Sequence, residues 1–373
     1  MTRYTDLVAR LPSTIPFVAP EEAERQRGRP FAARIGANES GFGPSPKAVA
    51  AMAQAAADSW QYGDPTSHDL RAAIAAQHNI PAAAIRVGEG IDGLLGLTVR
   101  LFVAPGETVV TSAGAYPTFN YHVAGFGGTL QPVPYVSDHE DPDELAAKAR
   151  ETRARLVYLA NPDNPMGSWH GAGRVADLLS ALPADCILCL DEAYIEFAPD
   201  GTALPFDLAD PRLLRFRTFS KARGMAGLRI GYVIGAPEIV AGFDRIRNHF
   251  GVSRVAQAGA LATLSDIAHL ENVRRRAAES RARIAEIARA SGLSPLPSAT
   301  NFVAVDCGRD GAFARRIMEE LADRDIFVRM PGVAPLNRCI RISCGTESDM
   351  ALLAEALPDS LRAAELGQDC APV

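Results

Sequence analysis

Residues 218–232 read TFSKARGMAGLRIGY and begin inside a candidate strand, RFRTF (215–219). The candidate strand ends in a hydroxyl, Ser220, and a lysine, Lys221, and an arginine, Arg229, follows with glycines between them. A lysine, unlike an arginine, can lose its proton when it is desolvated and can then attack an aldehyde to form a Schiff base. Ser220 and Arg229 are suitable hydrogen-bond donors for a phosphate. The stretch therefore predicts an aldehyde-binding lysine beside a phosphate site.

Two other polar motifs follow apolar runs earlier in the chain. NPDNPMG (161–167) follows LVYLA and carries the amide of Asn164, and DEAY (191–194) follows CILCL and begins with Asp191. Open α/β sheets bind their ligands beyond the carboxyl ends of the strands. A buried carboxylate is costly without a partner, so Asp191 should face a cation. The simpler interpretations, a turn for the first motif and a helix N-cap for Asp191, stay open at this point.

A glycine-rich motif, GEGIDG (88–93), fits the G-x-G-x-x-G fingerprint of dinucleotide sites. The next strand, TVVTS (108–112), ends in Ser112 and not in the acidic residue that binds a dinucleotide ribose. We therefore do not favour a nicotinamide cofactor. The free backbone N–H groups at the start of the helix that follows the motif would still bind a phosphate of another ligand.

Apolar runs alternate with amphipathic segments from Ile35 onward, which indicates an α/β layered domain. Expected strands lie at 85–87, 108–112, 156–160, 187–191, 215–219 and 229–235, with helices between them at 46–57 and 67–77, among others. A long helix rich in arginine and alanine is expected at about 265–290. Strand and helix patterns beyond it indicate a smaller α+β domain, and the chain after Leu361 is expected to fray.

The composition excludes several classes of protein. The chain has 373 residues, of which 47% are hydrophobic, so it can bury a large core. We expect a cytoplasmic protein, because no apolar run reaches about 18 residues and the first residues lack a secretory signal. A net charge of −6 argues against nucleic acid as a partner. Cys186 and Cys189 form a CxxC, but no second CxxC or nearby histidine completes a metal site, so we interpret them as buried thiols.

One cofactor explains the polar motifs together. Pyridoxal phosphate requires a lysine for its aldehyde, an acid for its pyridine nitrogen, donors for its phenolic oxygen, an aromatic face for its ring and an anion site for its phosphate. The chain supplies these groups at strand ends. We therefore predict pyridoxal 5'-phosphate as the cofactor and no metal.

In this order and spacing, NPDNPMG, DEAY and SKARGMAGLRIGY resemble the fold-type I pyridoxal phosphate enzymes, and within that class the histidinol-phosphate aminotransferase family. The resemblance runs from Phe17 to Gly345. It implies an aspartate-aminotransferase-like α/β fold, with a large mixed-sheet domain covered by helices on both faces and a smaller α+β domain. The expected parts are an N-terminal arm (1–34) against the small domain or a partner subunit, a large domain (35–245) and a small domain (246–373).

The resemblance also implies roles toward the cofactor. Lys221 would bind its aldehyde and later move the substrate's proton, and Asp191 would pair with its pyridinium nitrogen. Tyr194 and Asn164 would donate to its phenolic oxygen. Its phosphate would be held by Ser220, Arg229 and the backbone at Ile91 and Asp92.

Aromatic residues complete the implied site. Phe119, in AYPTFNY, matches the aromatic that stacks on the cofactor ring, with Tyr116 as the alternative in the same motif. Tyr62, in WQYGDP, matches a tyrosine that reaches the phosphate of the neighbouring subunit. The resemblance therefore implies a homodimer with shared active sites.

Two arginines, Arg329 in FVRM and Arg341 in CIRIS, match family residues that grip the anionic end of the substrate. With Asn164 and Phe17 they form the implied substrate site. Phe17 stands where the family often has a tyrosine, and Met166 stands where threonine is usual. The simpler interpretation is that both arginines form ion pairs at the surface.

The favoured function is a pyridoxal phosphate-dependent aminotransferase of amino-acid biosynthesis. It would move an amino group from histidinol phosphate or an aromatic amino acid to a 2-oxo acid such as 2-oxoglutarate, because imidazole and phenyl rings are similar flat bodies. A decarboxylase of the threonine-phosphate type is the alternative, and a racemase is a further one. A regulatory domain on the same fold is disfavoured, because the first 30 residues are too short for a winged helix.

Overall fold

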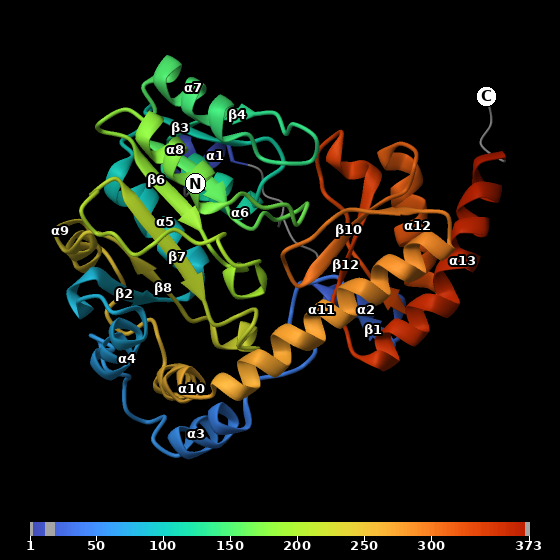
Figure 1. Ribbon diagram of the computed structural model, residues 1–373, viewed down its shortest axis with the longest axis horizontal. Helices are drawn as coiled ribbons and strands as arrows, with labels where there is room; N and C mark the ends of the chain where they lie inside the picture. The colour runs from blue at the N-terminus through green and yellow to red at the C-terminus, as the bar shows by residue number, and fades with distance from the viewer. Residues whose placement is uncertain (1–2, 12–18, 370–373) are drawn as a thin grey trace.

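The computed structural model describes residues 3–11 and 19–369, with side chains as far as Leu366. Figure 1 shows a large α/β body beside a smaller body that contains β10, β12 and the helices α11, α12 and α13. Among the described residues, no helix combines the length and apolarity that crossing a membrane requires.

A seven-stranded sheet forms the centre of the large body, in the order β2-β8-β7-β6-β5-β3-β4. Its strands are β2 (Ile85–Gly88), β3 (Thr108–Ser112), β4 (Thr129–Val133), β5 (Leu156–Ala160), β6 (Ile187–Asp191), β7 (Leu213–Thr218) and β8 (Gly231–Ile234). The strands from β4 to β7 are parallel, whereas β8 is antiparallel to both β7 and β2. The central strands β5 and β6 are buried along their whole length, as continuous apolar runs predict. The prediction of a mixed sheet is confirmed.

Helices cover both faces of this sheet, as predicted. Helices α5 (Gly90–Phe102) and α6 (Pro117–Gly125) pack on one face. Helices α7 (Pro142–Thr152) and α8 (Ala172–Ala181) pack on the other face. The carboxyl ends of the parallel strands are thereby left as the open edge where polar loops meet.

The β2 side of the sheet carries further helices: α3 (Pro46–Ala56), α4 (His68–His78), α9 (Pro237–Val240) and α10 (Arg254–Leu264). Helix α3 starts where the sequence predicts it, because Pro46 occupies the first turn and the Ser45 hydroxyl accepts from the backbone N–H of Ala48 at 3.1 Å. Short 3₁₀ helices lie at 82–84, 195–197, 226–228, 241–245 and 336–338.

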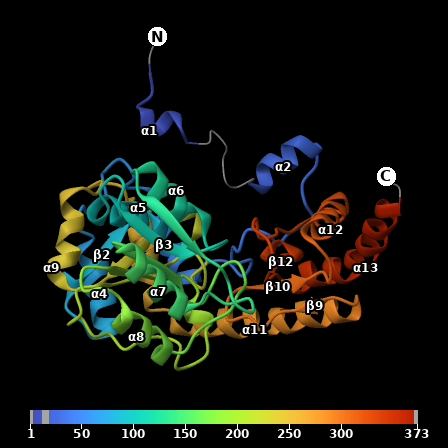
Figure 2. The same ribbon diagram turned by 90° about the horizontal axis from the view of Figure 1, so that it is seen from above.

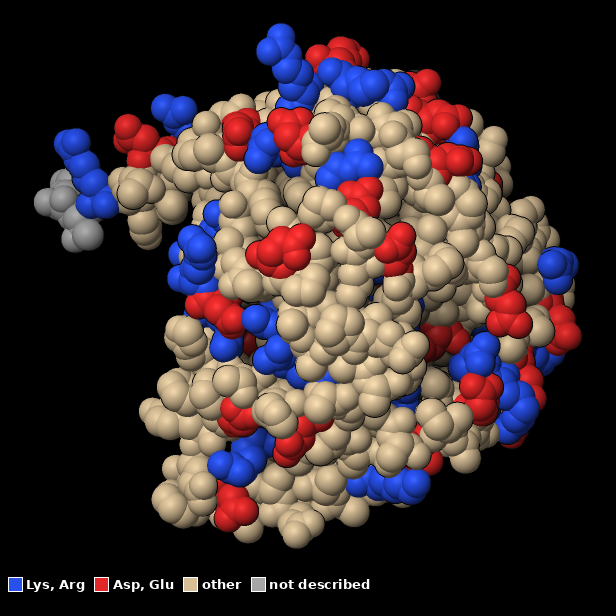
Figure 3. Space-filling view, turned by 60° about the vertical axis from the view of Figure 1, so that its left-hand side comes forward, with Lys and Arg blue, Asp and Glu red and all other residues tan. Residues whose placement is uncertain are grey.

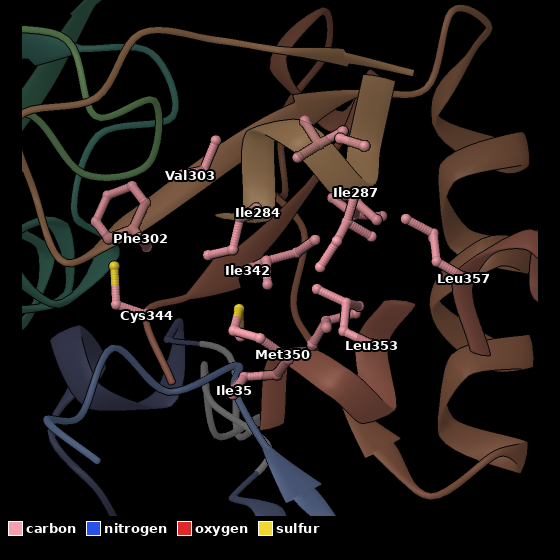
Figure 4. Packing of buried hydrophobic residues seen from close by; sticks show 14 of the residues in the cluster. Ile35, Ile284, Ile287, Phe302, Val303, Ile342, Cys344, Met350, Leu353 and Leu357 are labelled. Atoms are coloured by element: carbon pink, nitrogen blue, oxygen red, sulfur yellow. The ribbon is translucent and has the colours of Figure 1, made fainter. Parts of the chain in front are cut away.

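The smaller body is built on the antiparallel sheet β12-β10-β9. Its elements are α11 (Ile267–Ala290), β9 (Ser294–Pro295), β10 (Phe302–Asp306), α12 (Gly311–Asp323), β11 (Ile326–Phe327), β12 (Cys339–Ser343) and α13 (Glu347–Asp369). Figure 4 shows side chains of α11, β12 and α13, among them Ile284, Ile342 and Leu357, meeting in one apolar core. The expectation of fraying after Leu361 is wrong as far as Asp369, because Leu361 and Ala364 bury their side chains in this core and hold the helix.

The N-terminal segment contains α1 (Asp6–Ala9), α2 (Pro20–Arg27) and β1 (Ala33–Arg34). Figure 2 shows α1 standing apart from α2, which lies beside α12. Strand β1 pairs in parallel with β11, and Arg27 forms an ion pair with Asp325 directly before β11. The end of α2 is therefore fastened to the smaller body.

Charges of both signs are interspersed on the face that Figure 3 shows. That face carries no continuous basic stripe of the kind that follows a nucleic-acid backbone.

Candidate active site

A cavity of about 1160 Å³ lies where the carboxyl ends of β5, β6 and β7 approach the smaller body. Most of the predicted site residues line it, although they come from distant parts of the chain: Ile91, Asp92, Tyr116, Asn164, Asp191, Tyr194, Ser220, Lys221, Arg229, Arg329 and Arg341. Phe119 and Tyr62 do not line it. Phe17 lies outside the described residues.

Lys221 extends into this cavity from the turn after β7. Its Nζ donates to the backbone carbonyl of Asn38 at 3.0 Å and lies 5.7 Å from the centre of the Tyr194 ring. Burial lowers the pKa of Lys221 to about 8, and the positive charges of Arg341 and Arg229 act in the same direction. A substantial share of the amine is therefore neutral near pH 8 and nucleophilic.

Asp191 is the last residue of β6 and is buried. Its Oδ2 accepts from the Tyr158 hydroxyl at 2.7 Å, and its Oδ1 accepts from the Ala193 backbone N–H at 2.9 Å. Burial raises the pKa of Asp191 to about 6, and these hydrogen bonds offset only part of the effect. A cation placed against this carboxylate would lower its pKa again, so Asp191 is suited to bind a cationic group.

The residue after Asp191 explains why that aspartate is fixed. Glu192 is buried and accepts from Arg215 at 2.7 and 3.1 Å and from Arg217 at 2.8 Å. The two arginines come from β7, so the ion pairs join the ends of β6 and β7. Sequence reasoning missed this cluster, although two arginines inside the candidate strand RFRTF indicated that a buried anion should lie nearby.

Asn38 is another residue that sequence reasoning did not assign. It has a positive φ of 55°, and its Nδ2 donates to the Tyr194 hydroxyl at 3.1 Å. Its backbone N–H donates to the Ser343 hydroxyl at 2.9 Å. Asn38 therefore connects Tyr194 and Lys221 with the smaller body.

Arg341 lies in β12 and is 9% exposed. One NH group of its guanidinium donates to Asn164 Oδ1 at 2.5 Å, whereas its buried Nε has no hydrogen-bond partner among the described residues. Burial lowers its pKa to about 10. The backbone of Arg329 pairs with that of Arg341, so two guanidinium groups line the same wall. A buried guanidinium with a free donor is suited to bind an anion. Arg341 is buried, so it does not form the surface ion pair that was the simpler interpretation of the sequence.

The predicted phosphate residues also lie together. Helix α5 begins at Gly90, which has a φ of 75°, and Ile91 and Asp92 follow in its first turn. The positive φ of Gly90 favours glycine, and a Cβ atom there would lie 2.7 Å from Nη2 of Arg229, so the guanidinium lies close to the start of α5. The Ser220 hydroxyl is hydrogen-bonded to Thr218 at 2.9 Å. A helix N-terminus, a hydroxyl and a guanidinium together suit a phosphate.

The structure does not support Phe119 as the aromatic that faces the ligand. Its side chain is fully buried and stacks on Tyr158 with ring centres 4.6 Å apart, so it packs behind the cavity wall. Tyr116, the alternative, lines the cavity. Tyr62 is 76% exposed, and its ring packs against that of Phe250 in a tilted arrangement with ring centres 4.7 Å apart.

These residues fit pyridoxal phosphate. The cavity offers a partly neutral lysine, a buried carboxylate suited to a cation, an aromatic ring and an anion site. The Nε of Arg341 remains as a donor for the anionic end of a substrate. The fold and this site together define the class of fold-type I pyridoxal phosphate-dependent enzymes.

Comparison with known proteins defines the family within this class. A model of the aminotransferase class I and II family matches residues 34–357, and the chain belongs to this family. A histidinol-phosphate aminotransferase of Anaeromyxobacter sp. (strain Fw109-5) is 38% identical over 345 residues, which cover 91% of this chain and 93% of the relative. Histidinol-phosphate aminotransferase 2 of Pseudomonas fluorescens (strain Pf-5) is 35% identical over 330 residues, which cover 87% of each.

Solved structures agree with this assignment. The crystal structure of histidinol-phosphate aminotransferase from Sinorhizobium meliloti in complex with pyridoxal-5'-phosphate is 55% identical, with a TM-score of 0.95 over 97% of this chain and 98% of that one. A mutant aspartate aminotransferase of Thermus thermophilus, at 20% identity, has a TM-score of 0.80 over 97% of this chain and 100% of that one, and shows the shared fold. The chain is a pyridoxal phosphate-dependent aminotransferase.

Proposed function

We propose that this aminotransferase takes its amino group from histidinol phosphate or an aromatic amino acid and gives it to a 2-oxo acid such as 2-oxoglutarate. The observation that carries the proposal is the free Nε of Arg341, buried at the wall of the cavity that Lys221 enters. A carboxylate or phosphate would complete the donors of this guanidinium. The names of the relatives from Anaeromyxobacter, Pseudomonas and Sinorhizobium support histidinol phosphate as the donor to test first.

The predicted site residues would hold the cofactor as follows. Lys221 would bind its aldehyde, and Asp191 would pair with its ring nitrogen. Tyr194 and Asn164 would donate to its phenolic oxygen, and the ring of Tyr116 would lie against its face. Its phosphate would be bound by Ser220, Arg229, the first backbone N–H groups of α5 at Ile91 and Asp92, and the Tyr62 hydroxyl of a second copy of the chain.

When it is bound, the cofactor withdraws electrons from the Cα atom of the amino substrate, which makes the Cα proton acidic. Lys221, whose pKa burial lowers to about 8, would accept that proton on Nζ and return it as a general acid. Asp191 would be ionised beside the cationic ring nitrogen and would keep that nitrogen protonated. Arg341 and Arg329 orient the substrate by its anionic group, so that the Cα–H bond points at Nζ.

A homodimer with shared active sites belongs to the proposal. Tyr62 does not line the cavity of its own chain, and it lies near other exposed aromatics: Trp60 is 82% exposed and Phe250 is 49% exposed. Large exposed aromatic side chains are typical of an interface with another chain. We also propose a cytoplasmic location, and a division into an arm (1–34), a large domain (35–245) and a small domain (246–373). Phe17 in the arm remains a proposed substrate contact.

The test is a panel of amines mixed with the purified yellow holoenzyme: histidinol phosphate, phenylalanine, tyrosine, histidine and threonine phosphate. The readout is the loss of the visible absorption band of the Lys221-bound cofactor, together with the 2-oxo product. Loss of the band with histidinol phosphate or with an aromatic amino acid supports the proposal and identifies the donor. Release of carbon dioxide from threonine phosphate, without a 2-oxo acid product, would replace it with a decarboxylase.

A further inference from the structure

A second cluster of buried ionisable groups lies behind the loop that carries Asn164. Glu140, two residues before α7, is 1% exposed, and Asp163, in the loop after β5, is 2% exposed. Neither side chain lines the cavity, and the site described above does not use them. The two carboxyl groups are hydrogen-bonded to each other.

The four oxygens of this pair accept from neutral donors. Glu140 Oε2 accepts from the Ser112 hydroxyl at 2.6 Å, and its Oε1 accepts from the Ala160 backbone N–H at 3.0 Å. Asp163 Oδ1 accepts from the Tyr135 hydroxyl at 2.8 Å, and its Oδ2 accepts from the Met166 backbone N–H at 3.0 Å. The remaining contact joins the two carboxyl groups, and a hydrogen bond between two carboxyl groups requires a proton on one of them.

No neighbouring cation among the described residues pairs with the two carboxyl groups in place of that proton. Neither carboxylate forms an ion pair with Lys, Arg or His among the described residues (3–11 and 19–369). The charged and titratable groups that face the pair from the neighbouring elements are Tyr135, His139, His170, Tyr158, Asp191 and Arg341. Burial raises the pKa of Asp163 to about 7, and its hydrogen bonds, including the one with Glu140, offset only part of the effect. Burial and the neighbouring charge of Asp163 raise the pKa of Glu140 well above its usual value.

We propose that Glu140 and Asp163 share one proton at neutral pH and act as positioning residues, which hold the loop of residues 160–168 so that Asn164 meets Arg341. The loop is attached to the pair along its length. The Ala160 N–H donates to Glu140, the Met166 N–H donates to Asp163, and the Asp163 N–H donates to the carbonyl of Ser168 at 2.8 Å.

Asn164 follows Asp163 directly, and its amide oxygen accepts from Arg341 at 2.5 Å. Loss of the shared proton would place two negative charges in contact and push the loop away from Glu140. The extra charge would also act on Arg341, because the charge of Asp163 raises the pKa of that guanidinium. The shared proton therefore supports the anion site of the proposed function.

The first test is infrared spectroscopy of the holoenzyme at neutral pH. The variant Glu140→Gln places a neutral amide where the shared proton lies: its oxygen can accept from Ala160, and its NH2 group can donate to Asp163 and to the Ser112 hydroxyl. The control Glu151→Gln removes a carboxylate at the exposed end of α7, where it pairs with Lys148. We expect a C=O stretch of a protonated carboxyl in the wild type and in the control, and its loss in Glu140→Gln. Its absence from the wild type would overturn the shared proton, whether or not the protein transaminates.

The second test is the pH profile of KM for 2-oxoglutarate, which rests on the proposed function. In the wild type we expect KM to rise about three- to tenfold above neutral pH, since one added charge acts near Arg341. In Glu140→Gln, where the pair cannot gain a second charge, the profile should be flat, with kcat little changed. Equal profiles in the two proteins would refute the positioning role. If no donor is transaminated, the proposed function is refuted. The infrared result then decides alone whether Glu140 and Asp163 share a proton.

Discussion

Replacing Arg341 with glutamine tests the anion site most sharply. The guanidinium is buried, one NH group is engaged by Asn164, and the free Nε is available to a substrate anion. Removing one partner of a buried, hydrogen-bonded charge pair costs about 2–5 kcal/mol. A central value of about 3 kcal/mol corresponds to roughly a hundredfold loss in kcat/KM for the 2-oxo acid. Arg341→Lys keeps the charge without the planar fork, so we expect about a tenfold loss.

The assay measures kcat and KM for the 2-oxo acid and for the amino donor separately. The matched control is Arg281→Lys, since Arg281 is a partly buried arginine of the smaller body that donates to the Thr300 carbonyl at 2.7 Å and does not line the cavity. The Arg341→Gln apoprotein should be at least as stable as the wild type, because burial already disfavours the charge and lowers the Arg341 pKa to about 10. A loss below about threefold, or an equal loss in the Arg281 control, would refute the assignment of this arginine to the substrate.

Three further predictions follow from the site and its supports. The pKa of Asp191 is raised from 3.8 to about 6 in the cofactor-free protein, so its contribution to stability is complete below pH 4 and is lost as the pH rises through 6. Asp191→Asn should therefore stabilise the apoprotein by about 2–3 kcal/mol at pH 8, measured by thermal unfolding. The same variant should lower kcat of the holoenzyme at least a hundredfold, and an unchanged kcat would contradict the pairing of Asp191 with the ring nitrogen of the cofactor. Glu192→Ala leaves Arg215 and Arg217 buried without their anion and should cost about 3–5 kcal/mol in urea unfolding, whereas a cost below about 1 kcal/mol would show that the cluster is solvated. Tyr62→Phe should raise the dissociation constant of pyridoxal phosphate about tenfold, measured by equilibrium dialysis, although the residue does not line the cavity of its own chain; no change would count against the shared site.

The sheet was predictable because its strands differ so clearly from their surroundings. The runs at 156–160 and 187–190 are apolar throughout, as expected of strands that are buried on both faces. The predicted bounds of both strands, 156–160 and 187–191, are those of the structure. The strand β4 (Thr129–Val133) was not predicted, because it is an edge strand that contains Gln131 and Pro132 and is only partly buried. Its hydrogen bonds to β3 define it, and the sequence pattern does not show them.

Side-chain positions within the site were predictable only where a motif fixes the spacing. Asp191 is the last residue of β6 and Lys221 lies in the turn after β7, so the strand ends determine where they lie. The motif favoured Phe119 over Tyr116 as the aromatic that faces the cofactor, whereas the structure places Tyr116 at the cavity and Phe119 against Tyr158. Asn38 was not assigned a role, because its contact with Tyr194 joins residues 156 positions apart. Contacts of this kind depend on the packing of the two bodies against each other.

The most direct measurement is to find where the cofactor is attached. The chain contains only three lysines, Lys47, Lys148 and Lys221, so the assignment has few alternatives. The holoenzyme would be reduced with borohydride, digested and analysed by peptide mass spectrometry, alongside Lys221→Ala. We predict the reduced cofactor on the peptide that contains Lys221, at one per chain, and neither the visible band nor a modified peptide in the variant. A cofactor attached to Lys47 or Lys148, or a Lys221→Ala protein that keeps both the band and its activity, would contradict the account.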